Sequence, residues 1–418
     1  MKESDKIGDL AIIVGIADSG STIDECERSL NELSKLLNTA GGEVFARVIQ
    51  VKESLDPRTC IGSGKVKELA EICKSSETNL VIFDIELSPS QIRNLENDIG
   101  NDVTVIDRSM LILDIFALHA VSGEGKLQVE LAQLRYSAPR LMGHGNEMSR
   151  LGGGIGTRGP GETKLESDRR HMKEKIVSLE RRLAELEKNR AIMRSQRDKS
   201  GLVKVALVGY TNAGKSTILN RLTGSNVLAE NKLFATLDPT TRKMELPCGE
   251  NILLTDTVGF VRKLPHHLVK AFKSTLDEVV YSDLLLIVSD FTDLEMDEHI
   301  NVAKNVISEL GASDKPVIYV YNKCDLTDES LISSDNAVYV SGSTGYGIED
   351  LLSAIENEIK KFKQKYTLLI PYNKQQIVSY LYNSYSVQSV TYSDEGIVVD
   401  VILDTKGKGI YKEYIIDN

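Results

Sequence analysis

The sequence predicts an α/β protein in four segments, and three patterns lead to that prediction. Strand-like apolar runs alternate with amphipathic helix-like runs over residues 1–108 and again over residues 200–364. Leucines at helical spacing fill residues 109–199, and a short strand, helix and strand pattern occupies residues 365–418. We therefore expect a small α/β domain, a long helical hairpin, a larger α/β domain with a mixed, mostly parallel sheet flanked by helices, and a small α+β C-terminal domain.

The first segment has the alternation of a small parallel sheet. We expect strands at 11–14, 44–51, 80–85 and 103–106, and helices at 23–37, 66–73 and from residue 89 onward. The last of these helices has a clear start signal. Ser88 can cap it, Pro89 suits the first helical position, and the Gln91 side chain can reach back to the cap.

The second segment is expected to form two long helices joined by a loop. Apolar residues recur at helical or heptad spacing at Leu127, Leu131, Leu134, Ile176, Leu179, Leu183 and Leu186. The heptad pattern lasts only about three heptads, which is short for a dimeric coiled coil. We therefore expect an antiparallel hairpin that packs on itself, in a protein that is mainly monomeric.

The loop between these helices, residues 143–161, contains eight glycines in 19 residues, against 31 in the whole chain of 418. One interpretation is a flexible tip, because glycine adds conformational entropy and no packing. The other is a backbone that approaches a partner closely, with Arg150 and Arg158 supplying charge. Residues 131–200 hold 16 Lys and Arg against 9 Asp and Glu, a local net charge of +7. This basic island fits nucleic-acid phosphates, although a solvated helix face explains the charge equally well.

The composition of the whole chain excludes several classes of protein. The net charge of −11 argues against a generic nucleic-acid coat or a basic membrane-surface protein. No run approaches the roughly 18–20 apolar residues of a membrane span, and the N-terminus has no secretory apolar region. The five cysteines form no CxxC pair, and the six histidines form no metal cluster. We therefore expect a cytoplasmic protein in a reducing compartment.

The third segment begins with a phosphate-binding loop. A buried strand at 203–208 leads into G-x-x-x-x-G-K-S, with a helix expected from 216 to 222. The loop consists of Gly209, Tyr210, Thr211, Asn212, Ala213, Gly214, Lys215 and Ser216. Its backbone N–H groups and the helix N-terminus suit phosphate oxygens. Lys215 is expected to reach the β- and γ-phosphates, and Ser216 to ligate Mg²⁺.

A D-x-x-G motif follows the next buried strand, which is expected at 251–255. Its residues are Asp256, Thr257, Val258 and Gly259. An aspartate at a strand tip with a glycine shortly after it suits a Mg²⁺-side carboxylate and an amide that senses the γ-phosphate. The pattern is weak alone and becomes strong after a phosphate-binding loop.

A third motif predicts that the base is guanine. A strand at 316–321 ends in Asn322, Lys323, Cys324 and Asp325. The Asp325 carboxylate can accept hydrogen bonds from guanine N1–H and the exocyclic amine, a donor pair that adenine lacks. Asn322 would hold the loop and the base edge, and the Lys323 stem would cover the ring. A strand at 338–340 then leads to Ser341, Gly342 and Ser343, where a backbone amide could contact the guanine oxygen.

Between the first two motifs lies the segment expected to close over the γ-phosphate and Mg²⁺. It contains Phe234, Ala235, Thr236, Leu237 and Asp238. From spacing alone Thr236, Thr240 and Thr241 are all candidates for the closing threonine. Together the motifs predict a P-loop GTPase domain that binds GTP and GDP with Mg²⁺.

No catalytic residue can be assigned with certainty. Many GTPases have glutamine directly after the D-x-x-G glycine, where it orients the attacking water. Here that position is Phe260, which cannot hydrogen-bond to water. We therefore expect slow hydrolysis unless a partner supplies or orders catalytic groups.

The sequence resembles the GTPase HflX family over roughly residues 10–360. The stretches that carry the resemblance are 87–96, 105–116, 128–136, the glycine-rich 153–163, and the segments 234–239 and 256–260. Lys164 departs from the family pattern, which commonly has glutamine there, and the C-terminal segment matches less sharply.

The resemblance implies a role and several residue assignments. It makes Thr236 the Mg²⁺-binding threonine alongside Ser216. It also implies association with the large ribosomal subunit, and splitting or rescue of stalled ribosomes under stress. The hairpin segment 131–200 and its loop 143–161 would then contact ribosomal RNA. Some members are reported to hydrolyse ATP through the N-terminal region, but residues 62–65 (GSGK) are only a fragment of a phosphate loop, and we expect a turn there.

Two other classes of function remain open from the residues. One is a regulatory GTPase that acts as a protein-binding switch without RNA contact. The other is an NTP-dependent RNA remodeller with nucleotide sites in both halves. The basic hairpin disfavours the first alternative, and the lack of a complete second phosphate loop disfavours the second.

Overall fold

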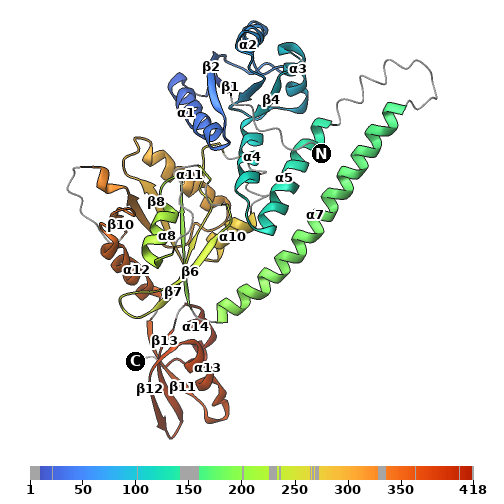
Figure 1. Ribbon diagram of the computed structural model, residues 1–418. Coiled ribbons are helices and arrows are strands. Elements are labelled where there is room, and N and C mark those ends of the chain that lie inside the picture. The colour runs from blue at the N-terminus through green and yellow to red at the C-terminus, as the bar shows by residue number, and fades with distance from the viewer. Residues whose placement is uncertain are drawn as a thin grey trace. The chain divides into compact units, whose positions relative to one another are not determined.

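A computed structural model (Figure 1) describes residues 10–20, 22–100, 102–141, 160–199, 202–225, 233–234, 237–263, 265, 268, 273–327, 336–362, 364–403 and 405–416. The chain divides into two compact units, and each is described by itself. The first comprises Met1–Leu186, Glu230–Asp238 and Gly259–Thr275, and the second Glu187–Ala229, Pro239–Val258 and Leu276–Asn418. Two short segments of the predicted nucleotide-binding domain therefore belong to the N-terminal unit.

The N-terminal unit contains the small parallel sheet that the sequence predicts. Its strand order is β2-β1-β3-β4, and every neighbouring pair is parallel. The strands are β1 (Leu10–Ala17), β2 (Glu43–Val51), β3 (Leu80–Phe83) and β4 (Thr104–Asp107). Buried aliphatic side chains such as Ile12, Val14 and Val81 form the core on this sheet.

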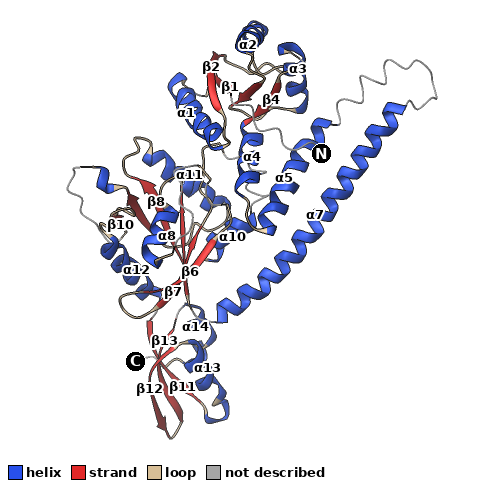
Figure 2. Cartoon of the chain, viewed as in Figure 1, coloured by secondary structure: helices blue, strands red, loops and turns tan. Residues whose placement is uncertain are grey.

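Three helices connect these strands (Figure 2). They are α1 (Ile23–Thr39), α2 (Ser63–Ser76) and α3 (Pro89–Ile99). The predicted start of α3 is confirmed, because Ser88 and Gln91 form a capping box and Pro89 occupies the first turn. The expectation of a turn at 62–65 is wrong. Gly62 is the N-cap of α2, and the following residues form its first helical turn.

The described part of the hairpin segment contains one helix more than expected. The described helices are α4 (Arg108–His119), α5 (Gly123–Leu141) and α7 (Pro160–Lys199). The extra helix, α4, is apolar on nearly all sides and buried, so it shows no amphipathic period that would separate it from its neighbours. Ion pairs Lys175–Glu130 at 2.6 Å and Arg135–Glu180 at 2.7 Å join α5 to α7. Most of the glycine-rich loop, 143–159, lies outside the described residues, and α7 already begins at Pro160.

The second unit contains a six-stranded sheet of order β10-β9-β8-β5-β7-β6. Only the β6–β7 pair is antiparallel, so the predicted mixed, mostly parallel sheet is confirmed. The strands are β5 (Val203–Gly209), β6 (Thr240–Glu245), β7 (Asn251–Asp256), β8 (Leu284–Asp290), β9 (Val317–Asn322) and β10 (Ala337–Tyr339). The helices are α8 (Lys215–Thr223), α10 (Lys273–Tyr281), α11 (Met296–Glu309) and α12 (Ile348–Phe362), with a short 3₁₀ turn η1 (Cys324–Leu326).

The topology of this sheet places the predicted motifs together. Strands β5, β7, β9 and β10 are parallel, so their carboxyl ends meet at one edge. Each of the motifs predicted to bind nucleotide follows directly from one of these ends. The sheet is held by an apolar core that includes Leu207, Leu254 and Leu286, all with no exposed surface.

A three-stranded antiparallel sheet of order β11-β13-β12 completes the chain. Its elements are β11 (Gln364–Ile370), α13 (Gln376–Ser384), β12 (Ser386–Ser393), β13 (Gly396–Leu403) and α14 (Thr405–Ile410), with short 3₁₀ turns η2 (Tyr372–Lys374) and η3 (Lys412–Tyr414). The predicted α+β character is confirmed, but β12 was not foreseen. Its residues are largely exposed and polar, so they lack the apolar alternation that predicts a strand.

Among the described helices, none has the length and apolar character needed to cross a bilayer.

Candidate nucleotide-binding site

The phosphate-binding loop connects the end of β5 to the start of α8, as the motif predicts. Gly209 has φ 146° and Gly214 has φ 93°, conformations that favour glycine. A Cβ atom at Gly209 would lie 2.1 Å from the Val288 carbonyl oxygen, and one at Gly214 would lie 2.1 Å from Asn322 Nδ2. Both positions therefore require glycine, because any larger residue would collide with the Val288 backbone or the Asn322 side chain.

Lys215 lies at the start of α8 and is buried. Its Nζ donates hydrogen bonds to the carbonyl oxygens of Gly209 at 3.2 Å and Tyr210 at 2.8 Å. Burial lowers the pKa of Lys215 to about 8, and the Asp256 carboxylate opposes that shift only in part. A buried ammonium with so little compensating charge suits an anionic ligand such as phosphate.

The loop also holds a buried hydroxyl that suits a ligand. Thr211 is buried, and its Oγ1 makes no hydrogen bond within the described part of the chain. Buried polar atoms of this kind normally have a partner, and a phosphate oxygen would be one. Tyr210 stacks on His299 with ring centroids 3.7 Å apart, which fixes one side of the loop.

The D-x-x-G motif meets the phosphate-binding loop. Ser216 Oγ donates to Asp256 Oδ2 at 2.6 Å, and Asp256 is fully buried. Thr257 Oγ1 donates to the Leu207 carbonyl oxygen at 2.7 Å, which ties the end of β7 to β5. A serine hydroxyl held beside a buried carboxylate is a donor set that hard cations such as Mg²⁺ accept.

Asn322 joins three of the predicted loops. Its Nδ2 donates to the Ala213 carbonyl oxygen at 2.8 Å, and its Oδ1 accepts from the Gly342 N–H at 3.0 Å. Asn322 is buried, and both of these neighbours belong to other predicted motifs. Its side chain therefore holds the phosphate loop, the N-K-C-D motif and the 341–343 loop together. This is the loop-holding role that the sequence predicts for Asn322.

Lys323 and Asp325 also lie at the end of β9. Lys323 has φ 67°, and its Nζ forms an ion pair with Asp290 at 2.6 Å. Burial raises the pKa of Asp290, but hydrogen bonds from Lys323 and Thr292 outweigh it and leave the pKa below its ordinary value. Ser343 Oγ donates to Asp325 Oδ2 at 3.3 Å, so the loop 341–343 contacts the predicted guanine-binding aspartate.

Two of the three candidate threonines of the closing segment lie in the described part of the chain. Thr240 and Thr241 are strand residues of β6, and the Thr241 and Thr255 hydroxyls lie 2.9 Å apart. Ala235 and Thr236 lie outside the described residues. Phe234 and Asp238 are described, and their contacts are with the N-terminal unit. The Phe234 ring packs edge-on against Phe116 of α4 with centroids 4.6 Å apart.

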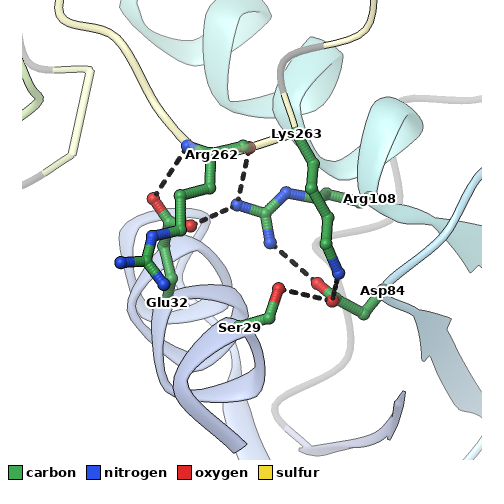
Figure 3. A network of polar contacts seen from close by, with 6 residues as sticks. All are labelled: Ser29, Glu32, Asp84, Arg108, Arg262 and Lys263. Atoms are coloured by element: carbon green, nitrogen blue, oxygen red, sulfur yellow. Dashed lines mark hydrogen bonds and ion pairs between the residues drawn. The ribbon is translucent and has the colours of Figure 1, made fainter. Parts of the chain in front are cut away.

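The residues after the D-x-x-G motif also pack in the N-terminal unit (Figure 3). Phe260 is buried, with 1% of its surface exposed. Arg108 donates to the Arg262 carbonyl oxygen at 3.1 Å, and the Arg262 N–H donates to Glu32 at 3.4 Å. Lys263 forms an ion pair with Asp84 at 2.7 Å.

Arg108 is the centre of this polar network. It is buried and forms ion pairs with Glu32 at 2.5 Å and Asp84 at 2.7 Å. Burial lowers its pKa, but the two carboxylates outweigh that effect and raise it overall. The sequence does not predict Glu32, Asp84 and Arg108 as partners of the segment after Asp256. The one available signal was a charged residue at the edge of a strongly apolar run, 109–116.

Family models match successive parts of the chain. Models described as GTP-binding GTPase N-terminal and GTP-binding GTPase Middle Region match residues 27–117 and 119–197. A model described as 50S ribosome-binding GTPase matches residues 204–323, and an HflX C-terminal domain model matches residues 327–407.

Several curated relatives are similar over nearly the full length. The GTPase HflX of Caldanaerobacter subterraneus is 49% identical, with 100% of this chain and 96% of the relative covered. The GTPase HflX of Lacrimispora saccharolytica is 45% identical, with 94% of each covered. The Escherichia coli GTPase HflX is 41% identical, with 94% and 92% covered.

A solved structure of a GTP-binding protein from the archaeon Sulfolobus solfataricus, in complex with GDP, is also similar. It is 24% identical and covers 84% of this chain and 99% of its own, with a TM-score of 0.43. The full-length curated relatives decide the assignment, together with four motifs that meet at one sheet edge. This chain belongs to the GTPase HflX family, and it binds and hydrolyses GTP.

Proposed function

We propose that this GTPase associates with the large ribosomal subunit and splits or rescues stalled ribosomes under stress. The observation that carries the proposal is the match of residues 204–323 to a model described as 50S ribosome-binding GTPase. Binding to that partner would place the protein in the cytoplasm. The four-segment division at 108, 199 and 364 is likewise our proposal for how the chain is organised.

The hairpin offers a surface that suits ribosomal RNA. Seven cationic residues are exposed along the described part of α7: Arg169, Arg170, Lys173, Lys175, Arg181, Arg182 and Lys188. Exposed cations on one long helix neutralise phosphates without reading sequence, which is the main source of affinity for RNA backbones. These residues support a contact between the segment 131–200 and ribosomal RNA, with the loop 143–161 at its tip.

The nucleotide site supports distinct roles for its residues. Lys215 would pair with the β- and γ-phosphates, and Asp325 would bind the guanine edge. Ser216 and Thr236 would hold Mg²⁺, which when bound neutralises charge on the β- and γ-phosphates. The Ser216 hydroxyl beside the buried Asp256 fits that ion. Asn322 would position the base-binding and phosphate-binding loops relative to each other.

Hydrolysis by this site is proposed to depend on the partner. Phe260 occupies the position of the usual glutamine, and it is buried. A buried phenyl ring cannot orient water, so residue 260 supplies no group for that step. The large ribosomal subunit would provide or order the missing group.

The RNA-remodeller alternative gains no support from the N-terminal domain. Lys65 pairs with Glu68 at 2.7 Å on the first turns of α2, rather than ending a phosphate-binding loop. A protein-binding switch without RNA contact would leave the exposed cations of α7 without a role.

Sedimentation with ribosomes tests the proposal. The full chain is centrifuged with ribosomes in the presence of GDP or a non-hydrolysable GTP analogue. We expect the protein in the ribosomal fractions, with more bound in the presence of the analogue. Absence from those fractions with both nucleotides would refute the proposal.

A pair of charge variants separates RNA contact from protein contact. R181E/R182E changes the charge of α7 by −4, and K67E/K74E makes the same change on exposed residues of α2. We expect the first variant to lose ribosome binding and the second to keep it. Equal binding by both variants would favour a protein-binding switch.

A further inference from the structure

The loop after β10 that is predicted to meet the guanine oxygen has one backbone N–H group open to a ligand. The Ser341 N–H donates to the Tyr346 carbonyl oxygen at 2.9 Å, and the Gly342 N–H donates to Asn322 Oδ1 at 3.0 Å. The Ser343 N–H makes no hydrogen bond to any residue that the structure describes. Backbone N–H groups in folded proteins normally have a partner, and a base oxygen would be one.

Arg221, in the last turn of α8, holds the carbonyl groups on both sides of that amide. Its Nε donates to the Gly342 carbonyl oxygen at 3.2 Å, and its Nη2 donates to the Ser343 carbonyl oxygen. The Gly342 C=O and the Ser343 N–H belong to one planar trans peptide unit, so the two groups point in opposite directions. A carbonyl held by Arg221 therefore turns the Ser343 N–H away from the guanidinium.

Glycine at position 342 lets the loop lie close to α8. A Cβ atom there would lie 3.2 Å from Thr217 Cγ2 and 3.3 Å from Ile218 Cγ1, which is closer than ordinary contact between carbon atoms. A larger residue would push the loop away from the helix and lengthen its contacts with Arg221. The short distance between loop and helix is therefore part of what allows Arg221 to reach two carbonyls.

Ser343 also contacts the residue that is predicted to bind the other edge of guanine. Its Oγ donates to Asp325 Oδ2 at 3.3 Å. In guanine the N1–H donor and the O6 acceptor stand on neighbouring ring atoms, so their two protein partners must lie side by side. The Asp325 carboxylate suits the N1–H, and the Ser343 N–H suits O6. The hydrogen bond between the two residues keeps this acceptor and this donor together.

We propose that Arg221 is a positioning residue for guanine recognition, which directs the Ser343 N–H toward the O6 atom of the base. It acts through the peptide unit 342–343 rather than by touching the base. A guanidinium is a rigid fork of donors, which suits it to holding two successive carbonyls. Fixing the amide before the nucleotide arrives lowers the entropy cost of binding. This role rests on the proposed binding of guanine by Asp325 and the loop 341–343, and not on the ribosomal partner.

Affinities of the full chain for three nucleotides test this role. The probes are GDP, IDP, which lacks the 2-amino group but keeps O6, and 6-thio-GDP, in which sulfur, a weak acceptor, replaces O6. Arg221→Met removes both donors and keeps an unbranched apolar side chain. We expect it to weaken binding of GDP and IDP about fivefold each, and binding of 6-thio-GDP by less than about twofold. Arg221→Lys keeps the charge and should recover part of the loss.

Arg242→Met is the matched control. Arg242 is an exposed arginine of β6 whose Nη1 donates to the Thr241 carbonyl oxygen at 3.0 Å, and its replacement should leave all three affinities unchanged. A loss of GDP affinity below about twofold in Arg221→Met, or an equal loss for 6-thio-GDP, would overturn the proposal.

The wild type separates the two levels of the proposal. Equal wild-type affinities for GDP and 6-thio-GDP would refute the contact between the loop and O6, and the role of Arg221 with it. If the wild type prefers GDP and Arg221→Met keeps that preference undiminished, the contact stands and only the role of Arg221 is refuted.

Discussion

At the scale of single residues, the buried polar groups of the site have partners that sequence could predict only in part. Asn322 was predicted to hold its loop, and its side chain does bridge Ala213 and Gly342. The partners of Arg108 could not be predicted, because Glu32 and Asp84 are far from it in sequence. Such a contact depends on how strands β3 and β4 pair, which one-dimensional periodicity does not encode.

The choice of guanine can be tested at Asp325. Asp325→Asn replaces an acceptor oxygen with a donor, which leaves the guanine N1–H facing an amide. The loss of a charged hydrogen bond costs about 1.5–3 kcal/mol, so GTP affinity should fall roughly 10- to 150-fold. Xanthine nucleotides restore the donor and acceptor match, and their affinity should rise. Competition binding with both nucleotides measures this effect.

A matched control is Asp394→Asn, an exposed aspartate between β12 and β13 that should leave both affinities unchanged. Unchanged GTP affinity in Asp325→Asn would show that the base is bound elsewhere.

The Arg108 network predicts a pH-dependent stability defect. Burial raises the pKa of Asp84, but Arg108 and Lys263 outweigh it, so the carboxyl pKa lies below its ordinary value. Asp84 therefore stabilises the wild type above the ordinary carboxyl pKa, and this contribution is lost as the pH falls through the lowered value. Arg108→Met removes the main cation and leaves buried carboxylates, which should cost about 3–5 kcal/mol of unfolding free energy at pH 8.

The loss of unfolding free energy in Arg108→Met relative to the wild type should be smaller at pH 5 than at pH 8, because protonated carboxyls need no cation. Urea unfolding at the two pH values measures it. Arg58→Met removes an exposed ion pair with Asp98 and should have little effect at either pH. A deficit that is the same at pH 5 and pH 8 would contradict the role of the buried carboxylates.

At the scale of elements, the sequence predicts best where the apolar pattern has one clear period. The strands and helices of residues 10–107 were foreseen, including the capping box of α3, and so were strands β5, β7, β9 and β10 and helix α8 of the second unit. Two of the elements that were not foreseen have no such period. Helix α4 is apolar on nearly all sides, and β12 is largely polar and exposed, so neither shows the expected alternation.

The hairpin tip is the element most directly tied to the proposed partner. Deletion of residues 143–159, between α5 and α7, should abolish ribosome splitting while GTP and GDP affinities stay within twofold of the wild type. The reason is that none of the residues predicted to bind nucleotide lies in this loop. Density-gradient profiles of ribosomes with the variant measure splitting. A variant that still splits ribosomes would refute a role for the loop.

At the scale of the whole molecule, the net charge of −11 is a poor guide to the partner. The segment 131–200 carries +7, so the remaining chain carries −18 by difference. The exposed cations of α7 are a part of this positive charge that lies on the described surface. Family membership, by contrast, could be predicted from the sequence, because the motifs that carry it are contiguous stretches of the chain.

The central claim is that GTP turnover by this chain depends on the large ribosomal subunit. The most direct test measures steady-state GTP hydrolysis by the full chain alone, with isolated large subunits and with isolated small subunits. We predict slow turnover alone, because Phe260 cannot orient water, and at least a tenfold increase with large subunits only. Turnover that is equally fast without ribosomal subunits would contradict the claim.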